Sequence, residues 1–186
     1  MVKIVFMRHS EPDYSFVEER NYIGHGIDLA QLTKNGIQIA EKVSYDSRLD
    51  DAELIVSSPY TRALQTAAII SKNKNLDIKI ELDLHEWIPD LSFQYSSKEE
   101  APKANRLCIE YKGICPNTSE MKFENYENVF NRAKKALLNY KHYNKIIVVT
   151  HGIVMRRFAF APDIPFCGIT EVDFDELFLC AKFESY

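Results

Sequence analysis

The chain of 186 residues has few cysteines, no long apolar run and no excess of positive charge. Its four cysteines form no C-x-x-C pair, which argues against a zinc site and against a disulfide framework. No apolar run approaches the ~18 residues that a membrane-spanning helix needs. The formal net charge of -4 argues against a nucleic-acid-binding surface, which requires a basic face. We therefore expect a cytoplasmic protein with reduced cysteines and with neither a membrane nor a nucleic acid as partner.

Length and composition favour one globular domain over residues 1–186. Hydrophobic residues make up 46% and charged residues 27% of the chain, which is ordinary for a soluble protein. The short apolar stretch at the N-terminus is followed by Arg8 and His9 and by no small-residue cleavage site, so a signal peptide is not expected. An anion-binding site in this acidic protein would have to be a local cationic pocket.

Chemically active side chains follow three strand-like runs, each apolar and rich in β-branched residues. These are 2–7 before Arg8 and His9, 52–56 before Ser57 and Arg62, and 145–150 before His151 and Gly152. Helical patterns separate the runs, which predicts an α/β fold: a three-layer α/β/α sandwich with a mostly parallel central sheet. Ligands of such sheets bind beyond the carboxyl ends of the strands, so we expect these side chains to share one site.

Caps and spacing predict further elements. Thr33 is expected to cap a helix that reaches about Ser47, and Ser58-Pro59 to form the N-cap and first position of a helix with Arg62 in its first turn. The other expected elements are a strand at 76–82, helices at about 125–140 and from about Ile153, and a C-terminal hairpin of 168–174 and 177–183.

Residues 88–123 contain three prolines and little periodicity. They predict a long excursion with one short helix. An excursion of this length inside a compact domain is commonly a lid or a substrate-selecting insert.

The residues near the strand ends suit a dianionic phosphoryl group. Arg8 and Arg62 can bind its oxygens, because a guanidinium keeps its charge and donates in a planar fork. One nitrogen of His9 can act as the nucleophile when an acceptor holds the other and fixes the tautomer. His151 can donate to an equatorial oxygen as charge spreads in the transition state. Glu86, in a partly apolar setting, can keep a proton near neutral pH and protonate the leaving group.

Other interpretations of the polar residues are disfavoured. A packing or surface role is retained for the histidines outside this cluster, His25, His85 and His142. A metal site built from His9, Asp28 and His151 is disfavoured because the two nearby arginines would repel a cation. We expect neither a metal nor a cofactor.

Several motifs match those of a known family. They are Arg8-His9-Ser10, Leu32-Thr33-Lys34-Asn35-Gly36, Ser57-Ser58-Pro59-Tyr60-Thr61-Arg62-Ala63-Leu64-Gln65-Thr66-Ala67, Leu84-His85-Glu86 and Val149-Thr150-His151-Gly152. In this order, and over most of its length, the chain resembles the histidine phosphatase superfamily, the phosphoglycerate-mutase-like group. The resemblance implies that His9 is phosphorylated and that Glu86 donates the proton. It also implies a phosphoryl site of Arg8, Arg62 and His151 and a reaction without a metal.

The chain departs from the family pattern at the expected substrate site. Ser10 stands where the family has glycine, and Ser15 stands where many members have a phosphate-binding asparagine. Asn21 could take the place of that asparagine, and Gly152 follows the second histidine. These four residues are substrate-binding candidates. We expect the departures at Ser10 and Ser15 to change which substrate is bound more than how the reaction proceeds.

The leading hypothesis is a phosphatase that hydrolyses a phosphomonoester, either a small molecule or a phosphoprotein, through a phosphohistidine at His9. Two alternatives stay open. One is phosphoglycerate-mutase-type phosphotransfer, for which residues 88–123 offer no obvious basic cluster to bind a second anionic group. The other is a non-catalytic phosphate-binding regulatory module, for which Ser10 and Glu86 are the only support.

Overall fold

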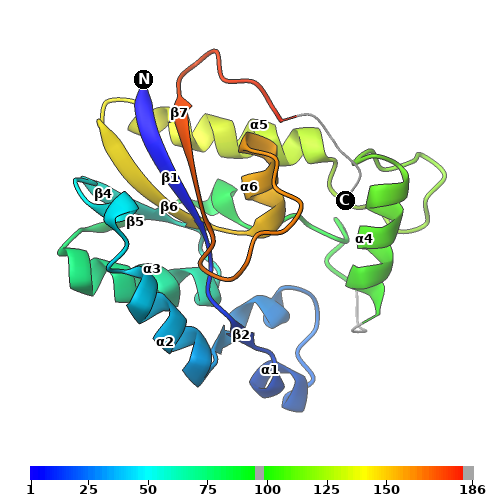
Figure 1. Ribbon diagram of the computed structural model, residues 1–186. Helices are drawn as coiled ribbons and strands as arrows, with labels where there is room; N and C mark the ends of the chain where they lie inside the picture. The colour runs from blue at the N-terminus through cyan, green and yellow to red at the C-terminus, as the bar shows by residue number, and fades with distance from the viewer. Residues whose placement is uncertain (95–98, 182–186) are drawn as a thin grey trace.

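The computed structural model describes residues 1–94 and 99–181. A five-stranded sheet of order β5-β4-β6-β1-β7 forms its centre, and β2 pairs with β3 in a separate two-stranded sheet. Helices cover both faces of the central sheet (Figure 1), which confirms the predicted α/β sandwich. The elements are β1 Val2–Arg8, β2 Pro12–Asp13, α1 Ser15–Glu19, η1 Gly24–Leu29, β3 Gln31–Leu32, α2 Lys34–Val43, η2 Ser47–Leu49, β4 Leu54–Ser57, α3 Thr61–Lys74, β5 Ile78–Ile80, η3 Leu82–Leu84, α4 Glu100–Glu110, α5 Tyr126–Leu137, η4 Leu138–Tyr140, β6 Lys145–Thr150, α6 Gly152–Phe158 and β7 Ile169–Phe174, where η marks a 3₁₀ helix.

Alternate residues of the central strands pack on opposite faces of the sheet. In β1, Ile4 and Phe6 join the cluster that contains α5 and α6, whereas Val5 and Met7 join the cluster that contains α2 and α3. Successive side chains of a strand point to opposite faces, so a strand covered on both sides must be apolar throughout. This is why the runs detected in the sequence are continuous rather than alternating.

The carboxyl ends of β4, β6 and β1 lie side by side. The three strands are adjacent and parallel, and the register places Arg8 opposite Thr150. Backbone hydrogen bonds extend the pairing beyond the strand ends, from His9 N to Thr150 O at 2.8 Å and from Ser58 N to Val149 O at 2.9 Å. The sheet itself therefore fixes the relative positions of the residues that follow these strands.

The predicted helices are present, with changes at their ends. Thr33 caps α2 through its side chain, but α2 ends earlier than expected, at Val43. The prediction that Ser58 caps α3 is wrong, because Tyr60 occupies the N-cap position and the hydroxyl of Ser58 lies 2.7 Å from Nε2 of His151. Among residues 1–94 and 99–181, no helix is long and apolar enough to cross a membrane.

The predicted C-terminal hairpin is wrong for the described residues. β7 pairs antiparallel with β1, and residues 177–181 form no strand. The remainder of the expected second strand lies outside the described residues. Phe178 instead contacts the rings of Phe158 and Phe174. β7 thus pairs with the edge of β1 and not with a following hairpin strand.

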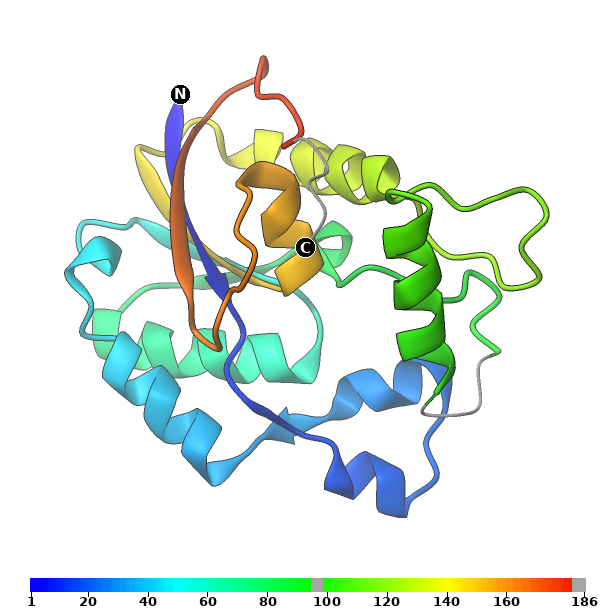
Figure 2. The same cartoon turned by 45° about the vertical axis from the view of Figure 1, so that its right-hand side comes forward.

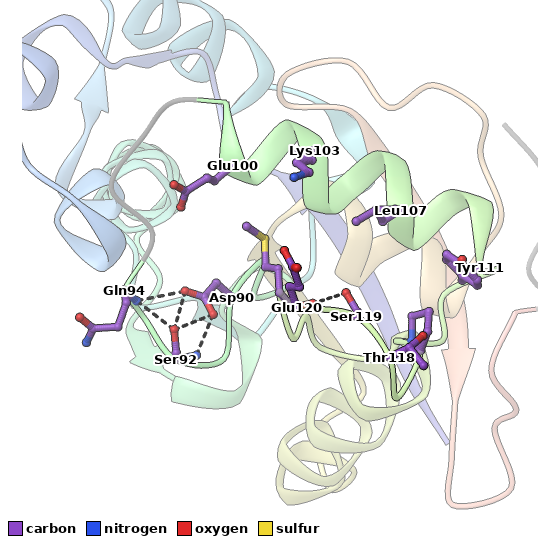
Figure 3. A pocket seen from close by; sticks show the side chains of 12 residues that line it. Asp90, Ser92, Gln94, Glu100, Lys103, Leu107, Tyr111, Thr118, Ser119 and Glu120 are labelled. Carbon is purple, nitrogen blue, oxygen red and sulfur yellow. Dashed lines mark hydrogen bonds between the residues drawn. The ribbon is translucent and has the colours of Figure 1, made fainter.

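Residues 88–123 leave the sandwich, and backbone hydrogen bonds join the base of this excursion at residues 88, 91, 122 and 124, which we call the neck. Glu124 N donates to Ile88 O at 2.9 Å, and Leu91 N donates to Lys122 O at 2.7 Å. Beyond the neck, the described residues form loops and the one short helix that was predicted, α4, which stands apart from the sheet in Figure 2. A cavity of about 550 Å³ lies between α4 and the loop at 116–121 (Figure 3).

Candidate active site

His9 follows β1 and is buried. Its Nδ1 lies 2.7 Å from the carbonyl oxygen of Ser10. A carbonyl oxygen only accepts, so Nδ1 carries the hydrogen and Nε2 carries the lone pair. Nε2 accepts from Nε of Arg62 at 3.3 Å. Burial, together with the charge of Arg62, lowers the pKa of His9 to about 3, so its ring is neutral near pH 7.

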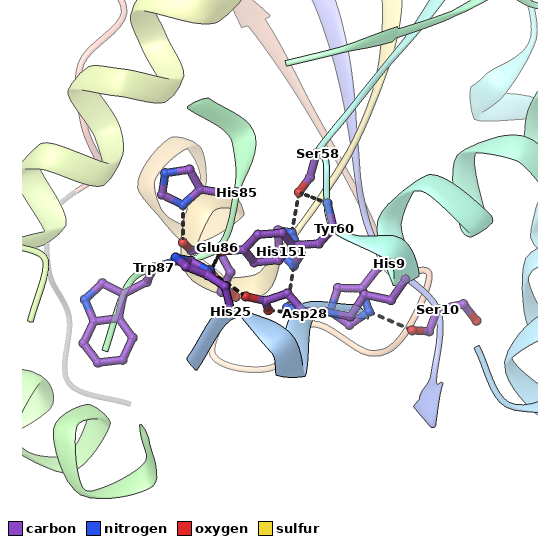
Figure 4. A network of polar contacts seen from close by, with 11 residues as sticks. His9, Ser10, His25, Asp28, Ser58, Tyr60, His85, Glu86, Trp87 and His151 are labelled. Carbon is purple, nitrogen blue, oxygen red and sulfur yellow. Dashed lines mark hydrogen bonds and ion pairs between the residues drawn. The ribbon is translucent and has the colours of Figure 1, made fainter. Parts of the chain in front are cut away.

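Arg62 lies in the first turn of α3, as predicted, and connects both histidines to Asp28 in the 3₁₀ helix η1. Its Nε donates to His9, and its Nη2 lies 3.5 Å from Nδ1 of His151. Its Nη1 donates to Oδ1 of Asp28 at 3.1 Å. Figure 4 shows the histidines and Asp28 gathered in one network. A single buried guanidinium therefore faces the space between the two imidazoles.

His151 follows β6 and is fully buried, with its ring centroid 5.1 Å from that of His9. Its Nε2 lies 2.7 Å from the hydroxyl of Ser58, which also accepts from Tyr60 N at 3.3 Å. Nη2 of Arg62 can only donate, so its contact with Nδ1 places the lone pair of the ring on Nδ1 and the ring hydrogen on Nε2, which donates to the Ser58 hydroxyl. Burial lowers the pKa of His151 well below 6.5. His151 is thus neutral, and its Nδ1 faces the same space as Arg62.

Arg8 approaches the site from the end of β1. Its Nη1 donates to Ile164 O at 2.5 Å, and its guanidinium lies 4.6 Å from the ring centre of Phe166. Its buried Nε has no hydrogen-bond partner among the described residues. A Cβ atom at Gly152 would lie 4.0 Å from this Nε, so the glycine keeps open the space beside it. Arg8 thus retains a donor for a bound anion.

Glu86 follows the 3₁₀ helix η3 and is partly buried. Its Oε1 accepts from Trp87 N at 2.9 Å, and its Oε2 accepts from Ile153 N at 3.4 Å. Burial raises the pKa of this carboxyl, as the sequence suggested. Glu86 and Arg62 line a cavity of about 180 Å³ together with side chains from the 88–123 excursion, Phe93 among them.

The hydroxyls of the serine candidates bind partners outside the cluster of His9, Arg62 and His151. The hydroxyl of Ser10 donates to Gly36 O at 2.6 Å, and the hydroxyl of Ser15 donates to Asp13 at 2.5 Å. Ser15 and Asn21 are exposed, and within the described residues no hydrogen bond joins either of them to His9, Arg62 or His151. Their role in substrate binding stays a prediction.

Sequence reasoning missed two partners of the cluster. Asp28, weighed only as a metal ligand, pairs with Arg62 and also lies 2.9 Å from Nδ1 of His25. Ser58 was predicted to cap a helix, but its partner is His151. Its place in the Ser57-Ser58-Pro59 motif is the signal that could have identified it as part of the site. In the part of the chain that the structure describes, no three His, Cys, Asp or Glu side chains are grouped to hold a metal ion.

Comparison with known proteins gives two curated relatives. Over 182 residues the chain is 27% identical to phosphoserine phosphatase 1 of Hydrogenobacter thermophilus, which covers 93% of this chain and 78% of that protein. Over 158 residues it is 23% identical to the adenosylcobalamin/alpha-ribazole phosphatase of Escherichia coli, which covers 83% of this chain and 75% of the relative.

Solved structures share the fold. YhfR of Bacillus stearothermophilus superposes with a TM-score of 0.70 at 20% identity, over 98% of this chain and 95% of that one. A mycobacterial glucosyl-3-phosphoglycerate phosphatase in complex with VO3 superposes with a TM-score of 0.69 at 17% identity, over 97% and 96% of the two chains.

The class of protein is therefore that of the hydrolases that act on phosphate esters. The family model that matches residues 4–162 is the histidine phosphatase superfamily (branch 1), and the chain belongs to this superfamily.

Proposed function

We propose that the protein hydrolyses a phosphomonoester through a phosphohistidine on Nε2 of His9, without a metal. The observation that carries this proposal is the state of that nitrogen. It bears a lone pair, because the carbonyl of Ser10 engages Nδ1, and it lies beside the guanidinium of Arg62. A nucleophilic nitrogen surrounded by cationic and neutral donors matches the needs of phosphoryl transfer.

In the first step, Nε2 of His9 attacks phosphorus and the bond from phosphorus to the ester oxygen breaks. The leaving oxygen takes the proton of Glu86. Arg8, Arg62 and His151 hold the remaining phosphoryl oxygens, on which charge is spread in the transition state. In the second step, water attacks phosphorus, the N–P bond breaks and Nε2 regains its lone pair. The carboxylate of Glu86 takes a proton from the water, which restores the starting state.

The cavity beside Glu86 favours hydrolysis over a mutase reaction. Among its described lining residues, Arg62 is the one guanidinium or ammonium group, while Asp28 and Glu86 are carboxylic. A second phosphate group on the substrate would meet the carboxylate of Asp28 at close range, which costs free energy. The curated relatives are named as phosphatases, which also favours a small phosphomonoester as substrate. Since Phe93 and Ala101 line this cavity, we propose that the 88–123 excursion selects the leaving group.

The test is the substitution His9→Ala. We expect kcat/KM for dinitrophenyl phosphate to fall by more than about 10³-fold, because the nucleophile is lost. In the parent protein, rapid quench during turnover should trap an acid-labile, base-stable phosphoryl group on His9. The control is His142→Ala, which removes an exposed histidine.

Equal activity of the His9→Ala variant, or no trapped adduct in the parent, would refute the phosphohistidine. Binding of inorganic phosphate without hydrolysis of any phosphomonoester in a broad panel would instead favour the regulatory-module alternative. Conversion of one phosphoglycerate isomer into another, without release of phosphate, would favour the mutase.

A further inference from the structure

The segment that carries Glu86 has little regular structure of its own. It follows η3, and the backbone hydrogen bonds of η3 end at Leu82 O, which accepts from His85 N at 3.1 Å. The next four carbonyl oxygens, of residues 83–86, all accept hydrogen bonds from side chains. Thr150 supplies the bond to Leu84 O, at 2.8 Å. The other three receive bonds from Arg132 of α5, and Glu86 O also accepts from Nδ1 of His85 at 2.7 Å.

The guanidinium of Arg132 has an acceptor for each of its five N–H bonds. Nη1 donates to Asp83 O at 2.5 Å and to His85 O at 2.9 Å, and Nη2 donates to Glu86 O at 3.2 Å. The two remaining donors bind the carboxylate of Glu124, from Nε at 2.7 Å and from Nη2 at 3.0 Å. This arrangement needs the planar fork of arginine, because the ammonium of lysine has three donors on one atom.

Glu124 holds the other side of the same segment. Its carboxylate accepts from Ile88 N at 3.3 Å, and its backbone carbonyl accepts from Nε1 of Trp87 at 2.6 Å. Both partners of the ion pair are largely buried, with 13% of the Arg132 side chain and 7% of the Glu124 side chain exposed. Arg132 and Glu124 therefore hold the chain immediately before and after the side chain of Glu86.

We propose that Arg132 is a positioning residue for the reaction: with Glu124, it holds the carboxyl group of Glu86 at the leaving oxygen. The inference rests on the proposed role of Glu86 as proton donor. Neither residue lines the described cavity that Glu86 borders, so their effect on the reaction runs through the backbone of 83–88 and, for Arg132, through its charge, which acts to lower the pKa of Glu86. Figure 4 shows His85, Glu86 and Trp87 of this segment beside the histidine network.

A displaced proton donor has a characteristic effect on the rate. A poor leaving group, such as phenoxide, needs the proton, whereas dinitrophenoxide leaves without it. A misplacement of about 1 Å can cost up to roughly 10²-fold in rate where the group acts. Loss of Arg132 should therefore lower kcat/KM for phenyl phosphate and spare dinitrophenyl phosphate. A merely structural role would lower both values together through the fraction of folded enzyme.

The experiment compares kcat/KM for these two esters in the full-length protein. Arg132→Lys keeps a charge beside Glu124 but loses the fork. The double variant Arg132→Met with Glu124→Gln removes the fork without leaving a buried charge unpaired, so that at least one variant folds. In both we expect a loss of about 10- to 10²-fold for phenyl phosphate and less than about threefold for dinitrophenyl phosphate. The matched control, Val129→Ala, removes buried volume from the same helix and should change both values equally.

An equal loss for the two esters in the folded Arg132 variants, or no loss, would overturn the inference. Glu86→Gln is measured in the same series to separate this failure from that of the proposed function. It should lose about 10²-fold or more with phenyl phosphate only. If Glu86→Gln shows this selective loss and the Arg132 variants do not, Arg132 does not position the donor. If Glu86→Gln itself shows none, the proton-donor role is refuted.

Discussion

The two sides of the candidate active site are built differently. On the phosphoryl side, His9 and His151 directly follow adjacent parallel strands, and Arg62 lies one short turn beyond a third. On the leaving-group side, Glu86 lies in a segment without sheet pairing, which side chains of α5 and the neck hold in place. The first side depends on the core of the fold, and the second depends on a few polar contacts between distant parts of the chain.

This difference predicts two classes of variant. Changes on the phosphoryl side should slow the reaction of every phosphomonoester to the same extent, because all esters share that group. Changes on the leaving-group side should act in proportion to the need of each substrate for a proton. The ratio of kcat/KM for phenyl and dinitrophenyl phosphate separates the classes, and four predictions test the distinction.

Of these four predictions, the one for Arg62 has the largest expected effect. Arg62→Met should lower kcat/KM by about 10²- to 10³-fold for both esters, because a preorganised donor to the phosphoryl oxygens is lost. Arg48→Met is the control, since Arg48 pairs with Asp46 at the surface. A loss confined to phenyl phosphate would place Arg62 on the leaving-group side and break the comparison.

The pH dependence should also differ between the esters. Glu86 must be protonated to donate, and burial raises the pKa of its carboxyl. As the pH rises through this raised pKa, kcat/KM for phenyl phosphate should fall, approaching about tenfold per pH unit. For dinitrophenyl phosphate the alkaline fall should be absent, and in Glu86→Gln it should be absent for both. The pKa values of His9 and His151 are lowered, so neither ring produces this alkaline limb.

A smaller effect, about tenfold and equal for both esters, is expected for Ser58→Ala. The substitution leaves the buried Nε2 of His151 without its partner and releases the tautomer that this partner fixes. The neighbouring Ser57→Ala is the control, since the hydroxyl of Ser57 bonds only to the carbonyl of Ser58 among the described residues. Comparable kinetics of the two variants would show that the tautomer is not set by Ser58.

The smallest kinetic effect is expected at the position where the family has glycine. Ser10→Gly removes the hydrogen bond to Gly36 O and should lower the free energy of unfolding by about 1 kcal/mol. Because that hydroxyl is engaged away from His9, kcat/KM should change by less than about threefold for both esters. Urea denaturation and steady-state kinetics measure the two quantities. A larger kinetic change would return Ser10 to the list of residues that shape the reaction.

The sequence predicted that His9, Arg62 and His151 would lie together because the signals for this are local. A buried strand that ends in a reactive residue can be detected within ten positions, and parallel pairing then brings the strand ends together. The partners that escaped prediction are separated widely along the chain, as Asp28 is from Arg62 and Asp83 is from Arg132. No periodicity marks such pairs. Ser58 shows a second limit, because a hydroxyl before a helix suits an N-cap and an imidazole equally well.

The neck has a consequence for how the protein can change. The 88–123 excursion is closed at its base by hydrogen bonds between the segments around Ile88 and Glu124, and Glu86 lies on the sandwich side of that closure. The entropic cost of a loop grows only with the logarithm of its length, so residues can be inserted into the loops beyond the closure at little cost in stability, provided that α4 keeps Ala104 and Cys108 in the core. Such length variation would reshape what enters the cavity while the proton donor stays in place. The part of the chain that lines the cavity can thereby change in length independently of the segment that carries Glu86.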